Sequence, residues 1–158
     1  MIATQTSARF TVYSDALELR TADRTQFIDI TQWVGESLRR SGIGSGLAQV
    51  QVLHTTASIL VNENEPLLLN DFKAMLERLA PENGVYEHDD MGRREGGVAE
   101  ERPNGRAHAR ALIGGPSTVI SVLDGRAVLG RWQSVFLLEL DGPRDRRVCL
   151  TVMGHEIT

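Results

Sequence analysis

The chain has 158 residues, of which 41% are hydrophobic and 24% charged, and its formal net charge is −4. This length favours one domain, which we place over residues 1–158, and the composition excludes a wholly disordered or fibrous chain. The acidic balance argues against a general nucleic-acid-binding protein, because such proteins need a clustered positive surface. It does not argue against a small anionic ligand, which needs only a local group of basic side chains.

Cysteine usage and the N-terminus indicate the cellular setting. Cys149 is the only cysteine, so an intrachain disulfide is excluded, and its apolar neighbours predict a buried, unreactive thiol. The N-terminus has no signal-peptide pattern, and no apolar run approaches the roughly 18–20 residues of a membrane helix. We therefore expect a cytoplasmic protein with no membrane partner.

The first third of the chain predicts strands and one helix. Alternating runs at 9–14 and 17–21 predict a β-hairpin, and residues 26–30 predict a third strand. Thr31 is a candidate cap for a short helix that extends to about Arg40.

Residues 46–60 follow as a strand region. Val50 and Val52 alternate with glutamines, which is the pattern of a strand with one buried face. The same parity predicts that His54 points to that buried face.

The middle of the chain predicts helices around a long loop. Pro66 is expected in the first turn of an amphipathic helix that ends before Pro81. The charged, glycine-rich stretch 89–104 has no periodicity and predicts a loop that is mobile between about 90 and 100. A short helix is expected at 107–113.

The last third predicts a β-meander with strands inside 118–123, 127–140 and 147–153. Strands therefore dominate both ends of the chain and helices the middle, which is typical of an α+β fold. A meander of this kind leaves strand edges exposed, and assembly of several copies would cover them.

Several motifs are absent from the sequence, namely GxxxxGK[ST], GxGxxG after a strand, HExxH and GxSxG. We therefore expect no nucleotide or flavin cofactor, no zincin site and no hydrolase elbow. Three histidines with polar neighbours remain as candidates: His54, His88 and His108. Their spacing alone predicts no metal site. His108, however, follows a loop-to-helix transition rich in arginine, and helix starts and arginines together favour phosphate binding.

An ordered set of motifs resembles the YjbQ-like family, a group of small bacterial and archaeal proteins associated with a secondary thiamine-phosphate synthase activity. The matching segments span nearly the whole chain: HTTAS at 54–58, NENEPLLL at 62–69 with Asp71, YEHD at 86–89, ERPNGRAH at 101–108, DGR at 124–126, LGRWQ at 129–133 and ELDGPR at 139–144. The order of the set is specific to the family, whereas no single motif is.

The resemblance implies two packed, mainly antiparallel sheets with a few helices, associated as a homotrimer. It also implies a polar pocket that contains His54, His88 and His108 and that binds a divalent metal, zinc or magnesium. Many relatives carry a histidine at the position of Arg106, and an arginine there suits an anion instead.

The activity implied by the resemblance joins a pyrimidine pyrophosphate to a thiazole phosphate, so the partner is a small phosphorylated substrate. We assign catalytic roles to His54, His108 and Asn62. Substrate binding is assigned to Asn104 and four arginines: Arg102, Arg106, Arg110 and Arg131. The charge on the phosphates calls for such cations.

Alternatives stay open for this hypothesis. The protein would equally suit a trimer that binds a metal or a phosphorylated metabolite without significant turnover. Asn62 fits a helix-capping turn before Pro66 as well as it fits a pocket wall. Trp132 is better explained as an aromatic anchor than as a ligand-stacking residue.

Overall fold

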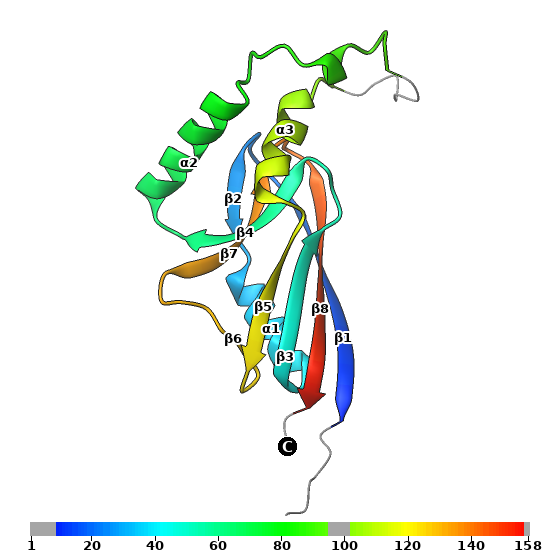
Figure 1. Ribbon diagram of the computed structural model, residues 1–158, viewed down its shortest axis with the longest axis vertical. Helices are drawn as coiled ribbons and strands as arrows, with labels where there is room; N and C mark the ends of the chain where they lie inside the picture. Colours follow the sequence, from blue (N-terminus) through cyan, green and yellow to red (C-terminus); the bar gives the residue numbers. More distant parts are fainter. Residues whose placement is uncertain (1–8, 95–101, 157–158) are drawn as a thin grey trace, which may run out of the picture.

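A computed structural model of the chain describes residues 9–94 and 102–156 (Figure 1). Two antiparallel sheets form the body. The five-stranded sheet has the order β1 (Phe10–Arg20), β8 (Asp145–Glu156), β3 (Ile43–Val52), β5 (Ser117–Leu123) and β6 (Arg126–Ala127). The three-stranded sheet has the order β2 (Gln26–Asp29), β7 (Gln133–Glu139) and β4 (Ala57–Glu63). The α+β class with two antiparallel sheets is therefore confirmed.

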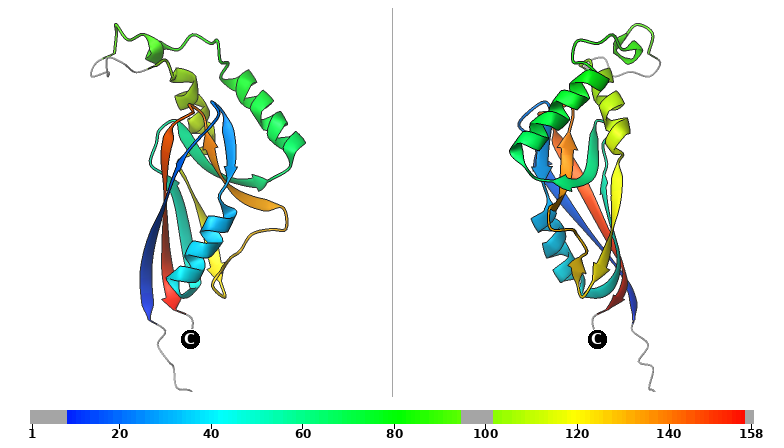
Figure 2. Two further views of the ribbon diagram at one scale, coloured as in Figure 1. Left: turned by 180° about the vertical axis from the view of Figure 1, so that it is seen from behind. Right: turned by 60° about the vertical axis from the view of Figure 1, so that its left-hand side comes forward.

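Three α-helices and one short 3-10 helix complete the described fold: α1 (Thr31–Ser41), α2 (Pro66–Leu79), η1 (Glu87–Asp89) and α3 (Gly105–Gly114). Helix α1 packs against strands of both sheets, whereas α2 stands apart from the body (Figures 1 and 2). Helix α2 buries only Leu76 fully, in a small cluster with Leu138, Leu140 and two alanines of α3.

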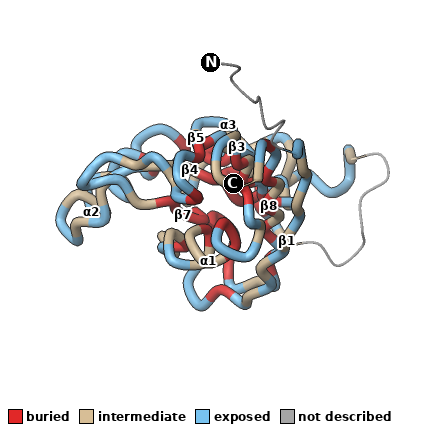
Figure 3. The backbone as a smooth tube through the Cα atoms, turned by 90° about the horizontal axis from the view of Figure 1, so that it is seen from below, coloured by how far each residue is buried: buried red, intermediate tan, exposed pale blue. Residues whose placement is uncertain are grey.

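The main core lies between the two sheets and α1, and the buried stretches of the chain gather there (Figure 3). Burial alternates along β3 and β8, whereas β7 is buried in five successive residues. Val50 and Val52 of β3 are buried as their alternation predicts. Facing positions on neighbouring elements are equally apolar: Val34, Leu38, Ile59, Ile120, Val122, Val135, Leu137, Val148, Leu150 and Val152.

The predicted N-terminal hairpin is wrong, because residues 10–20 form one uninterrupted strand. Asp15 does not make a turn. Its carboxylate accepts a hydrogen bond from the Ser37 hydroxyl at 2.5 Å and pairs with Arg40, so α1 satisfies this polar side chain within the strand. A polar interruption of an alternating pattern is thus explained by a partner distant in sequence.

The predicted meander is also wrong in its connections. The 127–140 segment is divided, since β6 belongs to the larger sheet and β7 to the smaller one. Strand β8 then returns between β1 and β3. Local alternation identifies strands, but it carries no information about which strand pairs with which.

Three smaller differences concern single segments. Strand β3 ends at Val52, so His54 lies in the turn before β4 rather than on the buried strand face. Cys149 is only half-buried, because it points away from the core side of β8. The predicted mobile loop falls partly on residues 95–101, which lie outside the described residues.

Candidate functional site

An open polar pocket of about 780 Å³ lies where the β3–β4 turn, the start of β8, η1 and α3 meet. The three candidate histidines and Asn104 all line it. The other lining residues are Arg20, Leu53, Thr55, Thr56, Arg94, Pro143, Arg144, Asp145 and Arg146. Among the described residues, four arginines and the carboxylate of Asp145 line this pocket.

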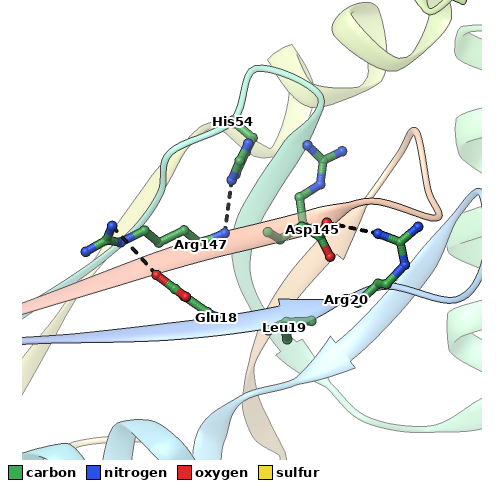
Figure 4. Close-up of a pocket in the computed structure, with 7 residues that line it drawn as sticks. Glu18, Leu19, Arg20, His54, Asp145 and Arg147 are labelled. Carbon is green, nitrogen blue, oxygen red and sulfur yellow. Dashed lines mark hydrogen bonds and ion pairs between the residues drawn. The ribbon is translucent and has the colours of Figure 1, made fainter.

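His54 is held by the backbone of β8 (Figure 4). Its Nε2 accepts the N–H of Arg147 at 2.9 Å, and the Leu53 N–H in turn donates to the Arg147 carbonyl at 3.1 Å. A backbone N–H can only donate, so the neutral ring must carry its proton on Nδ1. Burial, with the nearby Arg146 guanidinium, lowers the pKa of His54 and favours this neutral form.

Behind this turn lies a buried ion pair between Arg146 and Glu139. The guanidinium donates from Nε and Nη2 to the two carboxylate oxygens, each at 2.6 Å. Nη2 also donates to the Thr56 hydroxyl at 2.9 Å. Although burial alone would raise it, the pKa of Glu139 is lowered, chiefly because Arg146 and the Asp141 N–H donate to the carboxylate.

His88 and His108 come from η1 and from the first turn of α3, and their rings touch edge to face with centroids 4.6 Å apart. Asp89 fixes this arrangement, since its Oδ1 accepts the N–H groups of Asn104 at 2.9 Å and Gly105 at 2.8 Å. The sequence suggested that the start of this helix binds phosphate. Instead, the Asp89 carboxylate occupies the N–H groups there.

One nitrogen of the His88 side chain has an unfilled hydrogen bond. Its Nε2 is buried, and no hydrogen-bond partner for it occurs within the described ranges 9–94 and 102–156. A buried polar atom of this kind is costly unless something fills its hydrogen bond. The His88 residue lines the pocket, but its Nε2 is enclosed in this conformation.

The metal prediction meets a geometric difficulty. Among residues 9–94 and 102–156, no three His, Cys, Asp or Glu side chains are arranged to hold a metal ion. Nε2 of His54 is already engaged by the Arg147 N–H, while Nδ1 carries the proton. The three histidines share a pocket, but in this conformation they do not form a ready ligand set.

Two of the arginines assigned to substrate binding lie elsewhere, buried between α3 and the segment that follows α2. Arg106 donates to Glu82 at 2.8 Å, and Arg110 donates to Glu77 at 2.6 Å and to the Ala80 carbonyl. Neither lines the histidine pocket. The arginine at position 106, where many relatives carry a histidine, therefore adds an ion pair within the chain rather than a cation in the pocket.

The remaining assigned residues are also outside the pocket lining. Arg102 donates to the Asp141 and Gly142 carbonyls. Arg131 lies over the exposed Trp132 ring, 4.7 Å from its centroid, in the loop before β7. Asn62 lies on β4, and its Oδ1 accepts the Glu63 N–H. It borders a separate, apolar pocket of about 270 Å³ beside α2.

Four pocket arginines were missed from the sequence: Arg20, Arg94, Arg144 and Arg146. A partial signal exists for Arg144, which ends the ELDGPR segment that matches the family. For Arg20 and Arg146, only the pairing of β8 with β1 and β3 brings the side chains to the histidines, whereas Arg94 lies in the segment that follows η1 and His88.

Comparisons with known proteins agree with this fold. The profile of the family described as "UPF0047 protein YjbQ-like" matches residues 15–155. A UPF0047 protein of Methanothermobacter thermautotrophicus is 41% identical over 143 residues, which cover 90% of this chain and 93% of that protein. The UPF0047 protein YugU of Bacillus subtilis is 35% identical, covering 87% of this chain and 97% of that protein.

The chain belongs to the UPF0047/YjbQ-like family. Among solved structures, a protein of unknown function from Sulfolobus solfataricus superposes with a TM-score of 0.84 at 31% identity and covers 93% of this chain and 100% of that one. A hypothetical protein from Aeropyrum pernix gives a TM-score of 0.79 at 36% identity, covering 90% and 99%. The resemblance inferred from the motifs is therefore confirmed. Of the residues described here, no helix is long and apolar enough to cross a membrane.

Proposed function

We propose that the histidine pocket of this UPF0047 protein binds small phosphorylated metabolites and transfers a group between them, with a thiamine-phosphate synthase-like reaction as the specific case. The observation that carries the proposal is the composition of one pocket, whose described lining includes three histidines, four arginines and the carboxylate of Asp145. Arginine forks and neutral imidazole N–H groups are donors suited to phosphate oxygens. The volume of about 780 Å³ suits a ligand of metabolite size.

The proposed reaction needs cations more than it needs a strong base. The thiazole nitrogen forms a bond to the methylene carbon of the pyrimidine, the carbon–oxygen bond to pyrophosphate breaks, and pyrophosphate leaves with the electron pair. Negative charge therefore develops on the leaving group, where donors fixed in advance stabilise it. Arg144 and Arg146, which line the pocket, are candidates for these donors.

A second function, binding without turnover, is favoured by a specific observation. Pocket arginines already have carboxylate partners: Arg20 pairs with Asp145, Arg144 with Asp141 and Arg146 with Glu139. These pairs reduce the positive charge that could stabilise a transition state. They still leave guanidinium N–H groups that can bind an anionic ligand in its ground state.

We also propose that the protein assembles as a homotrimer through the outer face of the five-stranded sheet. Five exposed apolar side chains lie on this face: Val12, Leu47, Val119, Leu123 and Met153. Val12 and Leu47 both face Met153 on β8, so the patch is continuous across three strands. A patch of this kind is typical of an interface rather than of a solvated surface.

The test separates turnover from binding. Pyrophosphate binding is measured by calorimetry, and product formation is measured with the pyrimidine pyrophosphate and the thiazole phosphate. His88→Ala and Arg144→Gln should each weaken pyrophosphate binding about tenfold, since each removes one strong donor. Arg126→Gln, at the start of β6 and outside the pocket lining, is the control.

For an enzyme, His88→Ala should also lower the rate at saturating substrate. Pyrophosphate binding without any product would support the second function. No binding of pyrophosphate by the wild-type protein would contradict both.

A further inference from the structure

The β3–β4 turn that carries His54 is attached to the start of β8 by hydrogen bonds on both sides of the histidine. Before it, the Leu53 N–H donates to the Arg147 carbonyl. After it, Thr56 receives the Arg146 guanidinium on its hydroxyl. Between them, the Arg147 N–H donates to the ring itself. The orientation of the His54 ring therefore depends on where Arg146 and Arg147 are held.

Arg146 is in turn held by its two hydrogen bonds to the Glu139 carboxylate. This carboxylate is fully buried, and its oxygens also accept the Thr21 hydroxyl and the N–H groups of Leu140 and Asp141. Glu139 does not line the histidine pocket. Its hydrogen bonds reach the pocket lining through Arg146.

We propose that the buried Glu139–Arg146 pair is a positioning device that holds His54 with Nε2 as acceptor and Nδ1 as donor. Arg146 bridges Glu139 and Thr56 with one guanidinium, which fixes the end of the turn. The fixed turn places Nε2 of His54 2.9 Å from the Arg147 nitrogen. The tautomer is then set by the protein before any ligand arrives, so His54 meets phosphate oxygens as a donor.

This inference rests on the proposed function only for its consequence, which is the use of the Nδ1–H in ligand binding. The tautomer itself is a property of the protein without ligand. The ring geometry and the ligand affinity can therefore be tested separately.

The experiment uses the full chain with ¹⁵N-labelled histidine, at a fixed pH of about 8 where neutral imidazole predominates. The wild-type protein should show His54 with a protonated Nδ1 and an unprotonated Nε2. Glu139→Gln keeps the side-chain volume but cannot accept both guanidinium N–H groups, so it should release Arg146 and give a mixture of the two His54 tautomers. Pyrophosphate binding should weaken about fivefold, which is the effect of one misplaced hydrogen bond.

The matched control is Glu77→Gln, which also removes a carboxylate from a buried arginine, Arg110, but away from the pocket. It should leave the His54 signals unchanged. Arg146→Lys is a second test variant. It keeps the charge but cannot bridge Glu139 and Thr56, so it should also give a mixture of the two His54 tautomers.

Two outcomes would overturn the proposal: an Nε2-protonated His54 in the wild-type protein, or an unchanged tautomer in a folded Glu139→Gln or Arg146→Lys protein. If both variants fail to fold, Thr56→Val removes one hydrogen bond of the bridge and is judged by the same signals. A protein with the expected tautomers that does not bind pyrophosphate would contradict the proposed function while leaving the positioning role intact.

Discussion

The imidazoles of His88 and His108 lie edge to face, with ring centroids 4.6 Å apart and ring planes 62° apart. They are twenty residues apart in sequence and belong to different elements. What joins them is Asp89, which follows His88 directly and accepts the first N–H groups of α3. The carboxylate that caps the helix thus also places one histidine against the other.

Asp89→Ala should separate the two histidines and destabilise the protein. Two backbone N–H groups lose their acceptor, and a lost cap costs about 1 kcal/mol. Thermal unfolding measures the stability, and the pyrophosphate affinity measures the pocket. Asp90→Ala is the matched control, because Asp90 is exposed and its carboxylate pairs with Arg93 at 3.8 Å rather than with the start of α3. Equal effects of the two substitutions would contradict the role of Asp89.

Gly105→Ala should also destabilise the protein. A Cβ at this position would lie 2.5 Å from Cβ of Tyr86, so α3 and the segment before His88 would have to move apart. Such overpacking typically costs about 1–3 kcal/mol. Gly35→Ala in α1 is the control, since its Cβ would meet only the end of Arg39 at 4.0 Å. There we expect stabilisation of about 0.5–1 kcal/mol, because alanine favours the helix. Chemical denaturation of both variants checks the opposite signs.

The stability contributed by His54 should depend on pH. Burial lowers the pKa of His54 in the folded protein from about 6.5, so protonation favours the unfolded chain. Stability should be unaffected by this group above pH 7 and should fall as the pH drops below about 6.5 through the folded pKa. The free energy of unfolding of wild type and His54→Gln, measured from pH 8 to pH 5, tests this. A constant difference between the two proteins over that range would contradict it.

Zinc titration tests the metal prediction. Three neutral histidines suit zinc better than magnesium, which prefers oxygen ligands. We expect His108→Ala to abolish zinc retention without unfolding the protein, and zinc to be released below about pH 6.5. For His54 to bind through Nε2, the bond from the Arg147 N–H must break. Zinc binding that is unchanged in His54→Ala would show that this histidine is not a ligand.

Light scattering tests the assembly. The wild-type protein should have the mass of a trimer at micromolar concentration. Leu47→Glu places a charge in the middle of the exposed sheet face and should dissociate it. Leu112→Glu, at an exposed position on α3, should leave the mass unchanged. A wild-type monomer at micromolar concentration would contradict the proposal.

Features determined by neighbouring residues were predicted from the sequence. Pro66 does begin α2, and Glu65 before it accepts the Leu67 and Leu68 N–H groups, as a residue at a helix start does. The alternation of Val50 and Val52 identified a strand with one buried face. These signals are local in the chain, so a single sequence contains them.

Features determined by distant residues were not predicted. Arg106 and Arg110 looked like phosphate ligands because three arginines surround His108, yet their partners Glu82 and Glu77 lie 24 and 33 residues earlier. Arg146 was overlooked because its partner Glu139 and the histidine turn meet only once β8 has paired with β3. A charge pattern in one segment does not reveal which carboxylate will neutralise it.

The same two ion pairs describe how α2 and the turn after it are attached. Besides Leu76 and the contact of Phe72 with Phe27, the attachments of this region include the pairs of Glu77 with Arg110 and of Glu82 with Arg106. Arg110 also donates to the Ala80 carbonyl, and Arg24 also pairs with Glu82. Both glutamates are partly exposed to solvent, where dissolved ions weaken charge attraction. Their arginines, however, are almost fully buried, so salt screens these pairs less than it screens surface pairs, and the attachment of α2 depends on charges that the fold itself shields.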